Sequence, residues 1–337
     1  MASIHDVAKE AGVSVATVSK VINNYPDVSD KTRKKVSQTI KDLKYHPNVA
    51  ARGLVKGRSW TVGVFVTSPF TNPFVTELLE GIKTALQNSG YDLVLLSTRF
   101  DDDSYSFVEH CLSRNVDGVV GFGVDRDDPH LEELLKSDIP TMFVDADIRG
   151  PRAGYITTEN KAGTMQAVAH LAELGHSRIA FISGELDNAV GALRHEGYLE
   201  GMKTHKLNVP ESYVKVSDYS MEGGTVAMNE LMELKERPTA VVCTSDMMAI
   251  GAISVIHRSG LSVPEDISVV GFDNTYYSEI FSPALTTINQ NIRSIGSHAI
   301  ETLITMIENT DFLPPVVTEP SNLVVRCTTA KPGGAKS

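Results

Sequence analysis

The sequence is poor in cysteine and contains no long apolar run. Three cysteines, Cys111, Cys243 and Cys327, are scattered through 337 residues. An odd and scattered set argues against a disulfide framework, and none of the three has the spacing of metal ligands. No run of 18 apolar residues occurs, and the N-terminal MASIHDVAKE lacks the apolar segment of a secretion signal. We therefore expect a cytoplasmic protein with no membrane partner.

Motifs of the common enzyme classes are missing as well. The chain contains no P-loop, no H-E-x-x-H pair and no G-x-S-x-G elbow. The glycine-rich GVVGFG (118–123) is followed by VDRDDP, whose acids would repel a phosphate. His170 and His176 flank an expected helix end, where a surface or capping role is the simpler interpretation. The sequence therefore predicts that the protein is not an enzyme and has no catalytic residue, metal or cofactor.

The formal charge of −11 is divided unevenly along the chain. Residues 1–59 contain eleven Lys and Arg and five Asp and Glu, which gives +6, so residues 60–337 carry −17. A basic N-terminal head on an acidic body favours a polyanion partner at one end and repels it from the other. A solvated lysine-rich surface is the alternative interpretation of the same charge.

The basic head has the pattern of three short helices. Ser3 can cap the first helix, which stops at Gly12, and Ser14 can cap the second, VATVSKVIN, after a GVS turn. The third lies within SDKTRKKVSQTIKDLKY. Two short helices joined by such a turn predict a helix-turn-helix, whose second helix enters the major groove of DNA. Apolar residues at helical spacing are expected to form its core: Ile4, Val7, Ala8, Ala11, Val18, Val21, Ile22, Val36, Ile40 and Leu43.

The head also resembles a known family. From Ile4 to Leu54, the segments IHDVAKEAGVSVATVSKVIN, VSDKTRKKV and YHPNVAARGL resemble the N-terminus of the lactose-repressor/galactose-repressor (LacI/GalR) family. The resemblance implies that Val15, Ala16 and Lys20 face bases. Small Val15 and Ala16 can contact thymine methyl groups, whereas Lys20, where the family usually has arginine, reaches guanine without a rigid fork. Four polar residues are implied to lie near phosphates: Ser14, Thr17, Ser19 and Asn23.

PNVAARGL (47–54) resembles the hinge helix of that family. About eight residues are too few for a stable isolated helix, and Gly53, where the family more often has serine, weakens it by ~0.5–1 kcal/mol. We expect the segment to fold only on DNA, paired with its twin, with Asn48 and Ala51 at the DNA. Leu54 is expected to wedge into a pyrimidine–purine step of the minor groove and bend the duplex. Packing of Leu54 on the body is the alternative.

From Trp60 onward, apolar strands alternate with amphipathic helices. The expected strands include VGVFVT, YDLVLLS, VDGVVGFG and IPTMFVD, and after YITTEN the pattern restarts with RIAFISG and ISVVGFDNT. Such alternation predicts parallel, doubly wound sheets, and two sets predict two lobes. LEGIKT (79–84) and LEGMKT (199–204) suit duplicated lobes. The predicted fold class is a small all-α helix-turn-helix head plus an α/β body of two doubly wound parallel-sheet lobes.

Ligands of such sheets bind beyond the carboxyl ends of the strands. There the sequence places SPFTNPF (68–74), Asp145, ELDNAVGALR (185–194), TSD (244–246) and FDN (272–274). Carboxylates and arginine bind paired hydroxyl groups, and aromatic faces stack on sugar C–H surfaces. One acid at a strand end is usually a helix cap, but several around one cleft predict a site for a polyhydroxylated ligand.

The body resembles the periplasmic sugar-binding protein fold, the effector domain of this family. The resemblance implies a head at 1–45, a hinge helix and linker at 46–59, and a body at 60–337. Lobe 1 is implied at about 60–157 and 285–318, and lobe 2 at about 158–284 and 319–330. Ser245 replaces the asparagine often found there, and Asn72 and Tyr276 are the weaker matches. The implied sugar contacts are Asn72, Phe74, Asp145, Arg194, Ser245, Asp273, Tyr276 and Gln290.

These observations predict a transcriptional repressor of carbohydrate-utilisation genes that binds a palindromic double-stranded DNA operator as a homodimer and is released by a small sugar or sugar phosphate. The tail KPGGAKS has no leucine heptad, so we expect a dimer and not a coiled-coil tetramer. A catabolite-control-type regulator, whose DNA binding is strengthened by a phosphoprotein or small-molecule corepressor, is the main alternative, and a purine-type corepressor is another. A transport binding protein would share the body but not the basic head.

Overall fold

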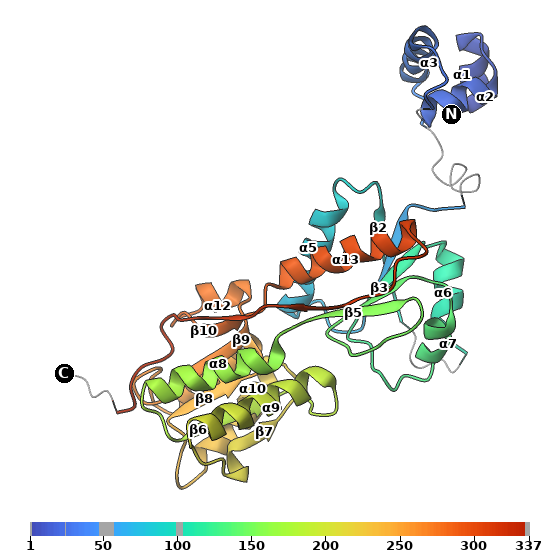
Figure 1. Cartoon of the computed structure of the whole chain (residues 1–337). Helices are drawn as coiled ribbons and strands as arrows, with labels where there is room; N and C mark the ends of the chain where they lie inside the picture. Colours follow the sequence, from blue (N-terminus) through green and yellow to red (C-terminus); the bar gives the residue numbers. More distant parts are fainter. Residues whose placement is uncertain (1, 24, 47–56, 99–103, 334–337) are drawn as a thin grey trace. The chain divides into compact units, whose positions relative to one another are not determined.

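A computed structural model describes residues 2–23, 25–46, 57–98 and 104–333 of the chain (Figure 1). The chain divides into two compact units, residues Met1–Trp60 and Thr61–Ser337. This division agrees with the head and body expected from the sequence. The predicted hinge residues Asn48, Ala51 and Leu54 lie outside the described residues, so their roles stay predictions.

The head folds into the predicted helices α1 (Ile4–Ala11), α2 (Val15–Ile22) and α3 (Asp30–Asp42). Ser3 and Asp6 form a capping box at the start of α1, and Gly12 ends that helix in the left-handed conformation at φ 60°. The helices enclose a small apolar core, against which the predicted core residues Ile4, Ile22, Ile40 and Leu43 pack only half-buried. Its buried members are Val7, Ala8, Ala11, Val18, Val21 and Val36.

Lobe 1 contains a parallel sheet in the order β11-β5-β4-β3-β1-β2. Phe65, Val119 and Phe143 pack on one face under α6 and α7. On the other face α13 lies alongside α5 (Figure 1). The strands are β1 (Thr61–Val66), β2 (Asp92–Leu96), β3 (Gly118–Phe122), β4 (Thr141–Val144), β5 (Ala153–Thr158) and β11 (Val316–Glu319), and the helices are α5 (Pro73–Leu86), α6 (Phe107–Arg114), α7 (Leu131–Lys136) and α13 (Ile292–Glu308).

Lobe 2 repeats this topology in the order β12-β10-β9-β8-β6-β7, which confirms the predicted duplication. Its edge strand β12 is antiparallel to β10, whereas every pairing in lobe 1 is parallel. The strands are β6 (Ile179–Ser183), β7 (Val214–Val216), β8 (Ala240–Cys243), β9 (Ser268–Asp273), β10 (Thr286–Asn289) and β12 (Asn322–Val324). The helices are α8 (Asn160–Glu173), α9 (Ala189–Thr204), α10 (Met221–Met232), α11 (Asp246–Arg258) and α12 (Tyr276–Ile280).

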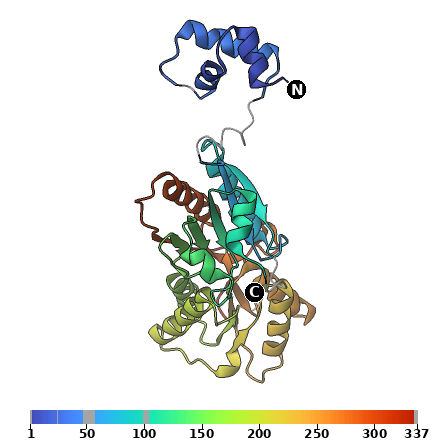
Figure 2. The same cartoon turned by 90° about the vertical axis from the view of Figure 1, so that its right-hand side faces the viewer.

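The chain crosses between the lobes after β5, after β10 and after β11. Figure 2 shows α13, which follows the second crossover, beside the sheet of lobe 1. The predicted boundary at residue 285 is wrong, because β10 pairs with β9 in lobe 2 and the crossover follows at Gln290. The strand belongs there because Thr286, Thr287 and Ile288 are fully buried in lobe 2. The lobes also touch where the backbone N–H of Tyr276 donates to Glu77 at 2.8 Å.

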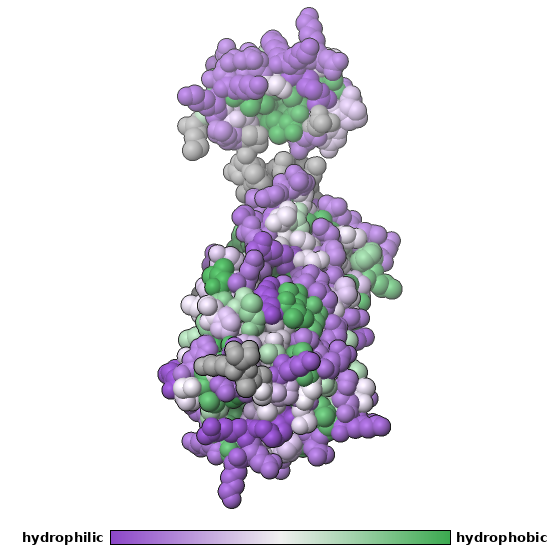
Figure 3. All heavy atoms as spheres, turned by 90° about the vertical axis from the view of Figure 1, so that its left-hand side faces the viewer, coloured by the Kyte–Doolittle hydropathy of each residue, from purple (hydrophilic) through white to green (hydrophobic). Residues whose placement is uncertain are grey.

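The surface of the body carries apolar side chains on several elements. Figure 3 shows apolar spots among polar side chains on one face. Tyr277 and Ile280 of α12 are exposed, as are Val226 of α10 and Leu95 of β2. A groove of about 630 Å³ runs between α5 and β2. None of the described helices is both long and apolar enough to cross a bilayer.

Candidate functional site

Helix α2 presents the residues predicted to meet DNA. Ser14 caps the helix, since its Oγ accepts a hydrogen bond from the Thr17 backbone N–H at 3.1 Å, and the two hydroxyls lie 2.9 Å apart. The N-terminus of a helix attracts anions, so Ser14 and Thr17 stand where a phosphate is favoured. Ala16 is exposed and Val15 is half-buried against the head core.

The opposite end of α2 carries the predicted polar contacts. The Lys20 ammonium donates to Asp27 at 2.5 Å, and both side chains are about half exposed. This ion pair lowers the pKa of Asp27. Asn23 ends the helix, and its side-chain amide donates to the Ser19 carbonyl at 2.9 Å. The structure therefore brings all seven predicted contacts of α2 onto one short helix and its caps.

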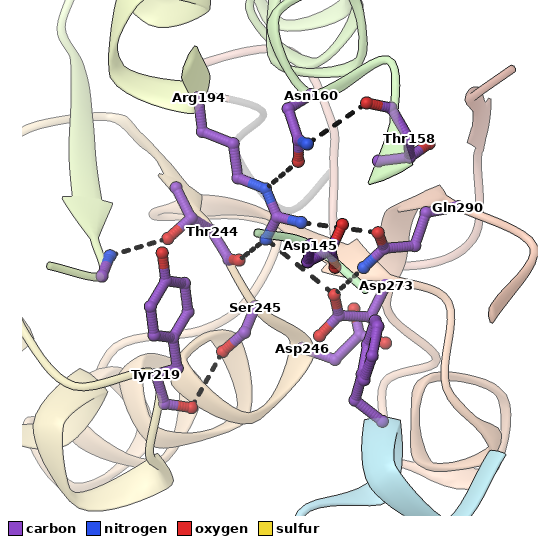
Figure 4. A network of polar contacts seen from close by, with 12 residues as sticks. Asp145, Thr158, Asn160, Arg194, Tyr219, Thr244, Ser245, Asp246, Asp273 and Gln290 are labelled. Carbon is purple, nitrogen blue, oxygen red and sulfur yellow. Dashed lines mark hydrogen bonds and ion pairs between the residues drawn. The ribbon is translucent and has the colours of Figure 1, made fainter. Parts of the chain in front are cut away.

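In the body, polar side chains converge where the carboxyl ends of the strands of both lobes face each other (Figure 4). We call this group the interlobe cluster. Asp145 comes directly after β4 of lobe 1, and the other members come from lobe 2 and from two crossovers. The members are Asp145, Asn160, Arg194, Tyr219, Thr244, Ser245, Asp246, Asp273 and Gln290.

Arg194 of α9 lies at the centre of the interlobe cluster and is only 3% exposed. Its Nε donates to Asn160 Oδ1 at 2.7 Å and its Nη1 to the Thr244 carbonyl at 2.6 Å. Its Nη2 lies 3.5 Å from Gln290 Oε1. The guanidinium also stacks over the Phe272 ring, 3.8 Å from the centroid. These contacts fix the plane of the charged group inside the protein.

Two carboxylates face Arg194 from different lobes. Asp273 lies 4.0 Å from Arg194 Nη1 and accepts a hydrogen bond from Gln290 Nε2 at 2.5 Å. Asp145 accepts one from the Thr157 hydroxyl at 2.7 Å. Burial raises the pKa of both carboxyls, most strongly that of Asp273, and the charge of Arg194 opposes the rise. The site is therefore rich in acceptors and tightly desolvated.

A third carboxylate, Asp246, interacts electrostatically with Asp273. It accepts hydrogen bonds from the backbone N–H of Thr275 at 2.7 Å, from the Thr275 hydroxyl at 3.0 Å and from the Thr287 hydroxyl at 2.5 Å. It is fully buried, and burial raises its pKa to about 7. The negative charge of Asp246 in turn raises the pKa of Asp273.

Strained backbone gathers around the cluster. Asp145, Tyr219 and Asp273 adopt positive φ, at 55°, 62° and 122°, and so do Asn274 and Asn291 beside it. Such conformations cost of order 1–3 kcal/mol each and are retained mostly at functional sites. The ring of Tyr219 also depends on Gly184, where a Cβ would lie 1.9 Å from its Cζ.

Three predicted contacts have structural partners of their own, and a fourth lies apart. Asn72 caps α5 by accepting from the Phe74 N–H, and the Phe74 ring stacks on Phe122 at 4.9 Å. Ser245 caps α11 and donates to the Tyr219 carbonyl. Tyr276 does not join the interlobe cluster, because its side chain is 62% exposed and its ring lies against Tyr277.

Sequence reasoning missed four members of the cluster: Asn160, Tyr219, Thr244 and Asp246. Thr244 and Asp246 flank Ser245 in the TSD segment, so the strand-end rule identifies their location. Tyr219 follows β7, whose three residues VKV carry no strong strand pattern. Asn160 follows the crossover from β5 and has no local signal of its own.

Comparison with known proteins supports both units. Residues 3–48 match the family described as bacterial regulatory proteins, lacI family, and residues 168–329 match a periplasmic binding protein-like domain. No group of three metal-ligating side chains occurs among the residues that the structure describes.

Similar proteins cover nearly the whole chain. The HTH-type transcriptional repressor PurR of Vibrio atlanticus is 35% identical over 92% of this chain and 93% of its own. Catabolite control protein A of Priestia megaterium is 36% identical over 89% and 91%. A crystal structure of the Lac repressor dimer bound to operator and the anti-inducer ONPF is 31% identical, with a TM-score of 0.83 over 98% of this chain and 99% of that chain. The chain therefore belongs to the lacI family of bacterial regulatory proteins.

Proposed function

We propose that the protein is a homodimeric transcriptional repressor that acts in the cytoplasm, binds a palindromic operator upstream of carbohydrate-utilisation genes, and is released by a neutral sugar. The observation that carries the ligand class is the composition of the interlobe cluster. One guanidinium, Arg194, stands among two buried carboxylates, Asp246 and Asp273, and the half-buried carboxylate of Asp145.

The charge of this site favours a neutral ligand over a phosphorylated one. A phosphate group would add negative charge beside carboxyls whose ionisation burial already disfavours. Arg194 is the single Lys or Arg in the interlobe cluster, and protein oxygens already accept from three of its five N–H groups. A sugar phosphate is therefore the less favoured ligand.

A hydroxyl-rich ligand matches the donors and acceptors that remain. A vicinal diol donates to the carboxylates Asp145 and Asp273 and accepts from the free N–H groups of Arg194. Because Asp145 comes from lobe 1 and Asp273 from lobe 2, one ligand bonded to both stabilises a closed arrangement of the lobes.

On the DNA side, α2 enters the major groove with Val15, Ala16 and Lys20 at the bases and Ser14, Thr17, Ser19 and Asn23 near phosphates. Two hinge segments fold in the central minor groove, where Leu54 unstacks a base step. Sugar closure moves lobe 1 and separates the hinge segments. A shift in occupancy from 99:1 to 1:99 requires a differential affinity of about 5.5 kcal/mol, which two sugar sites per dimer supply together.

The dimer is supported by apolar surface on the body. Tyr277, Ile280 and Val226 are about half exposed, as is Leu95 beside the groove between α5 and β2. Exposed apolar groups of this kind mark contact surfaces. Light scattering is expected to give the mass of two chains, and Ile280→Asp is expected to lower it toward one.

Thermal unfolding with a panel of neutral mono- and disaccharides and their phosphates tests the ligand class. A sugar at about 100 times its Kd adds roughly 2.7 kcal/mol to the free energy of unfolding. The same sugar must release a palindromic duplex selected from random DNA. Leu54→Ala is expected to weaken binding of that duplex, and unchanged binding would remove the wedge from the mechanism.

The second candidate is a corepressor that strengthens DNA binding. The similarity to catabolite control protein A favours a phosphoprotein or small-molecule corepressor, and the relatives named PurR favour a purine-type one. In that case no sugar raises the unfolding temperature, and a purine base or a phosphorylated carrier protein lowers the Kd for the palindrome.

A further inference from the structure

Asn160 occupies an unusual place between the lobes. It is the first residue of α8 and follows the crossover from β5, so it sits where lobe 1 becomes lobe 2. Its side chain is a neutral amide among charged neighbours and is 1% exposed. A buried amide requires partners for both its oxygen and its nitrogen. Those partners lie on different lobes.

On the side of lobe 1, the amide nitrogen of Asn160 donates to the hydroxyl of Thr157 at 3.0 Å and to the carbonyl of Thr158 at 3.2 Å. The Thr157 hydroxyl in turn donates a hydrogen bond to Asp145 Oδ1 at 2.7 Å. A single hydroxyl thus connects Asn160 to the carboxylate that lobe 1 contributes to the interlobe cluster.

On the side of lobe 2, the amide oxygen of Asn160 accepts the hydrogen bond from Arg194 Nε at 2.7 Å (Figure 4). Arg194 also reaches Gln290, which lies in a second crossover. The hydrogen-bonded path from Asp145 through Thr157 and Asn160 to Arg194 is therefore continuous and crosses from one lobe to the other.

We propose that Asn160 is a positioning residue for the effector site. Through the Thr157 hydroxyl, Asn160 couples Asp145 of lobe 1 to Arg194 of lobe 2. The inference rests on the proposed function, since it assigns the ligand to these two groups. A ligand that displaces Asp145 or Arg194 changes the geometry of the other through this path. Coupling between the lobes then depends on hydrogen bonds at the crossover as well as on the ligand itself.

Only an amide fits this position. Aspartate at 160 keeps the acceptor for Arg194 but loses the donors for Thr157 and Thr158, and it adds a fourth carboxylate to the cluster. An apolar side chain at 160 leaves the buried Nε–H of Arg194 without its acceptor, which disfavours the folded arrangement. The motif-based assignment overlooked the residue because its role is set by contacts to residues 157, 158 and 194.

Thr157 gives the cleaner experiment because its substitution does not touch Arg194 directly. Thr157→Val removes both hydrogen bonds of the hydroxyl, and Thr157→Ser retains them. Thr318→Val is the matched control, since Thr318 is the exposed partner of Thr157 in the neighbouring strand β11. Fluorescence anisotropy of the full-length protein on the selected palindrome measures DNA affinity and the sugar concentration for half-release.

We expect Thr157→Val to raise the half-release concentration of the active panel sugar by about tenfold, because it removes partly buried hydrogen bonds. The affinity for DNA without sugar is expected to stay within about twofold of the parent. Thr157→Ser and Thr318→Val are expected to match the parent. Asn160→Asp is expected to change release in the same direction as Thr157→Val. An unchanged half-release concentration in Thr157→Val, or equal impairment in Thr157→Ser, overturns the proposal while the proposed function stands.

If no panel sugar releases the parent protein from DNA, the proposed ligand class is refuted but the role of Asn160 is not. Amide hydrogen exchange without ligand then tests the hydrogen-bonded path. The path predicts that Thr157→Val accelerates amide exchange in β4 and β5 of lobe 1 and also in the first turns of α9 around Arg194. Thr157→Ser is expected to leave both unchanged. Acceleration confined to lobe 1 contradicts the path.

Discussion

The head and the body hold their binding groups in opposite ways. In the head, Ala16 and Lys20 project from α2 into solvent, and the contacts of Ser14 and Asn23 are to their own helix. In the body, Arg194 and Asp273 are 3% and 8% exposed, and their hydrogen-bond partners lie after strand β8 and in two of the three crossovers. Substitutions of the DNA-facing residues Ala16 and Lys20 should therefore change DNA binding without changing the stability of the head. Substitutions in the interlobe cluster should change both ligand binding and the stability of the body.

The largest expected effect is that of Arg194→Ala in the body. Removing the guanidinium leaves Asp273 and Asp145 without their cation and the Asn160 and Gln290 oxygens without a donor, and breaking a buried pair in this way costs about 3–5 kcal/mol. Calorimetry should show a lower unfolding temperature of the body and no shift with sugar. Lys203→Ala, at an exposed site in the last turn of the same helix, is the control. A full sugar response in Arg194→Ala would remove that residue from the site.

The second-largest effect is expected in the pH dependence of the stability of the body, through Asp246. The pKa of Asp246 in the folded body is about 7, above its value of 3.8 in an unfolded chain, so the folded state binds the extra proton. Stability contributed by Asp246 is therefore highest near pH 4, falls as the pH rises to 7 by at most about 1.4 kcal/mol per unit, and levels off above. Asp246→Asn removes the contribution of Asp246, so the variant is expected to lose less stability than the parent over this range, while Asp145 and Asp273 keep their own contributions. Denaturant melts between pH 4 and 8 check it, and parallel pH profiles for parent and variant would contradict it.

Lys20→Ala affects the head alone. Loss of one base contact should weaken binding to the selected palindrome by about 1–3 kcal/mol and reduce its salt dependence, while the unfolding temperature of the body stays unchanged. Lys20→Arg, with its rigid fork, should sharpen discrimination at one guanine. Lys34→Ala, an exposed lysine of α3, controls for general charge. An equal loss for Lys34→Ala would mean that Lys20 reads no base.

The smallest effect is expected from Ser14→Ala. The substitution removes the cap of α2 and destabilises the head by about 1 kcal/mol. Because the binding groups of the body depend on none of this helix, sugar-dependent stabilisation should persist in full. Circular dichroism of the head transition and the sugar-induced shift in the same sample measure both. A loss of the sugar response would show that head and body are not separable.

The sequence predicts the elements whose signals are local. Ser3, Gly12 and Ser14 cap their helices as expected, and strand-end positions locate Arg194 and Asp273. It fails where the partner lies far along the chain. The sequence of Thr286–Asn289 does not indicate whether the strand joins the sheet of lobe 1 or that of lobe 2. Its pairing with β9 and the hydrogen bond from Thr287 to Asp246 place it in lobe 2.

The same limit explains the missed residues of the interlobe cluster. Asn160 is an ordinary helix-start residue by sequence, and only its bonds to Arg194 and Thr157 give it a role. Tyr219 follows a strand of three residues, too short for a periodic pattern. Burial and long-range hydrogen bonds, not local propensity, assemble this part of the site.

The most direct measurement is reciprocal linkage between sugar and DNA on the full-length protein. The Kd for the selected palindrome is measured at increasing concentrations of the neutral sugar that stabilises the protein, and the Kd for the sugar is measured with and without the palindrome. Release through the interlobe cluster predicts that saturating sugar weakens DNA binding by at least about 100-fold. By linkage, DNA then weakens the binding of the two sugars to one dimer by the same factor in total. Sugar binding that leaves the affinity for DNA unchanged would contradict it.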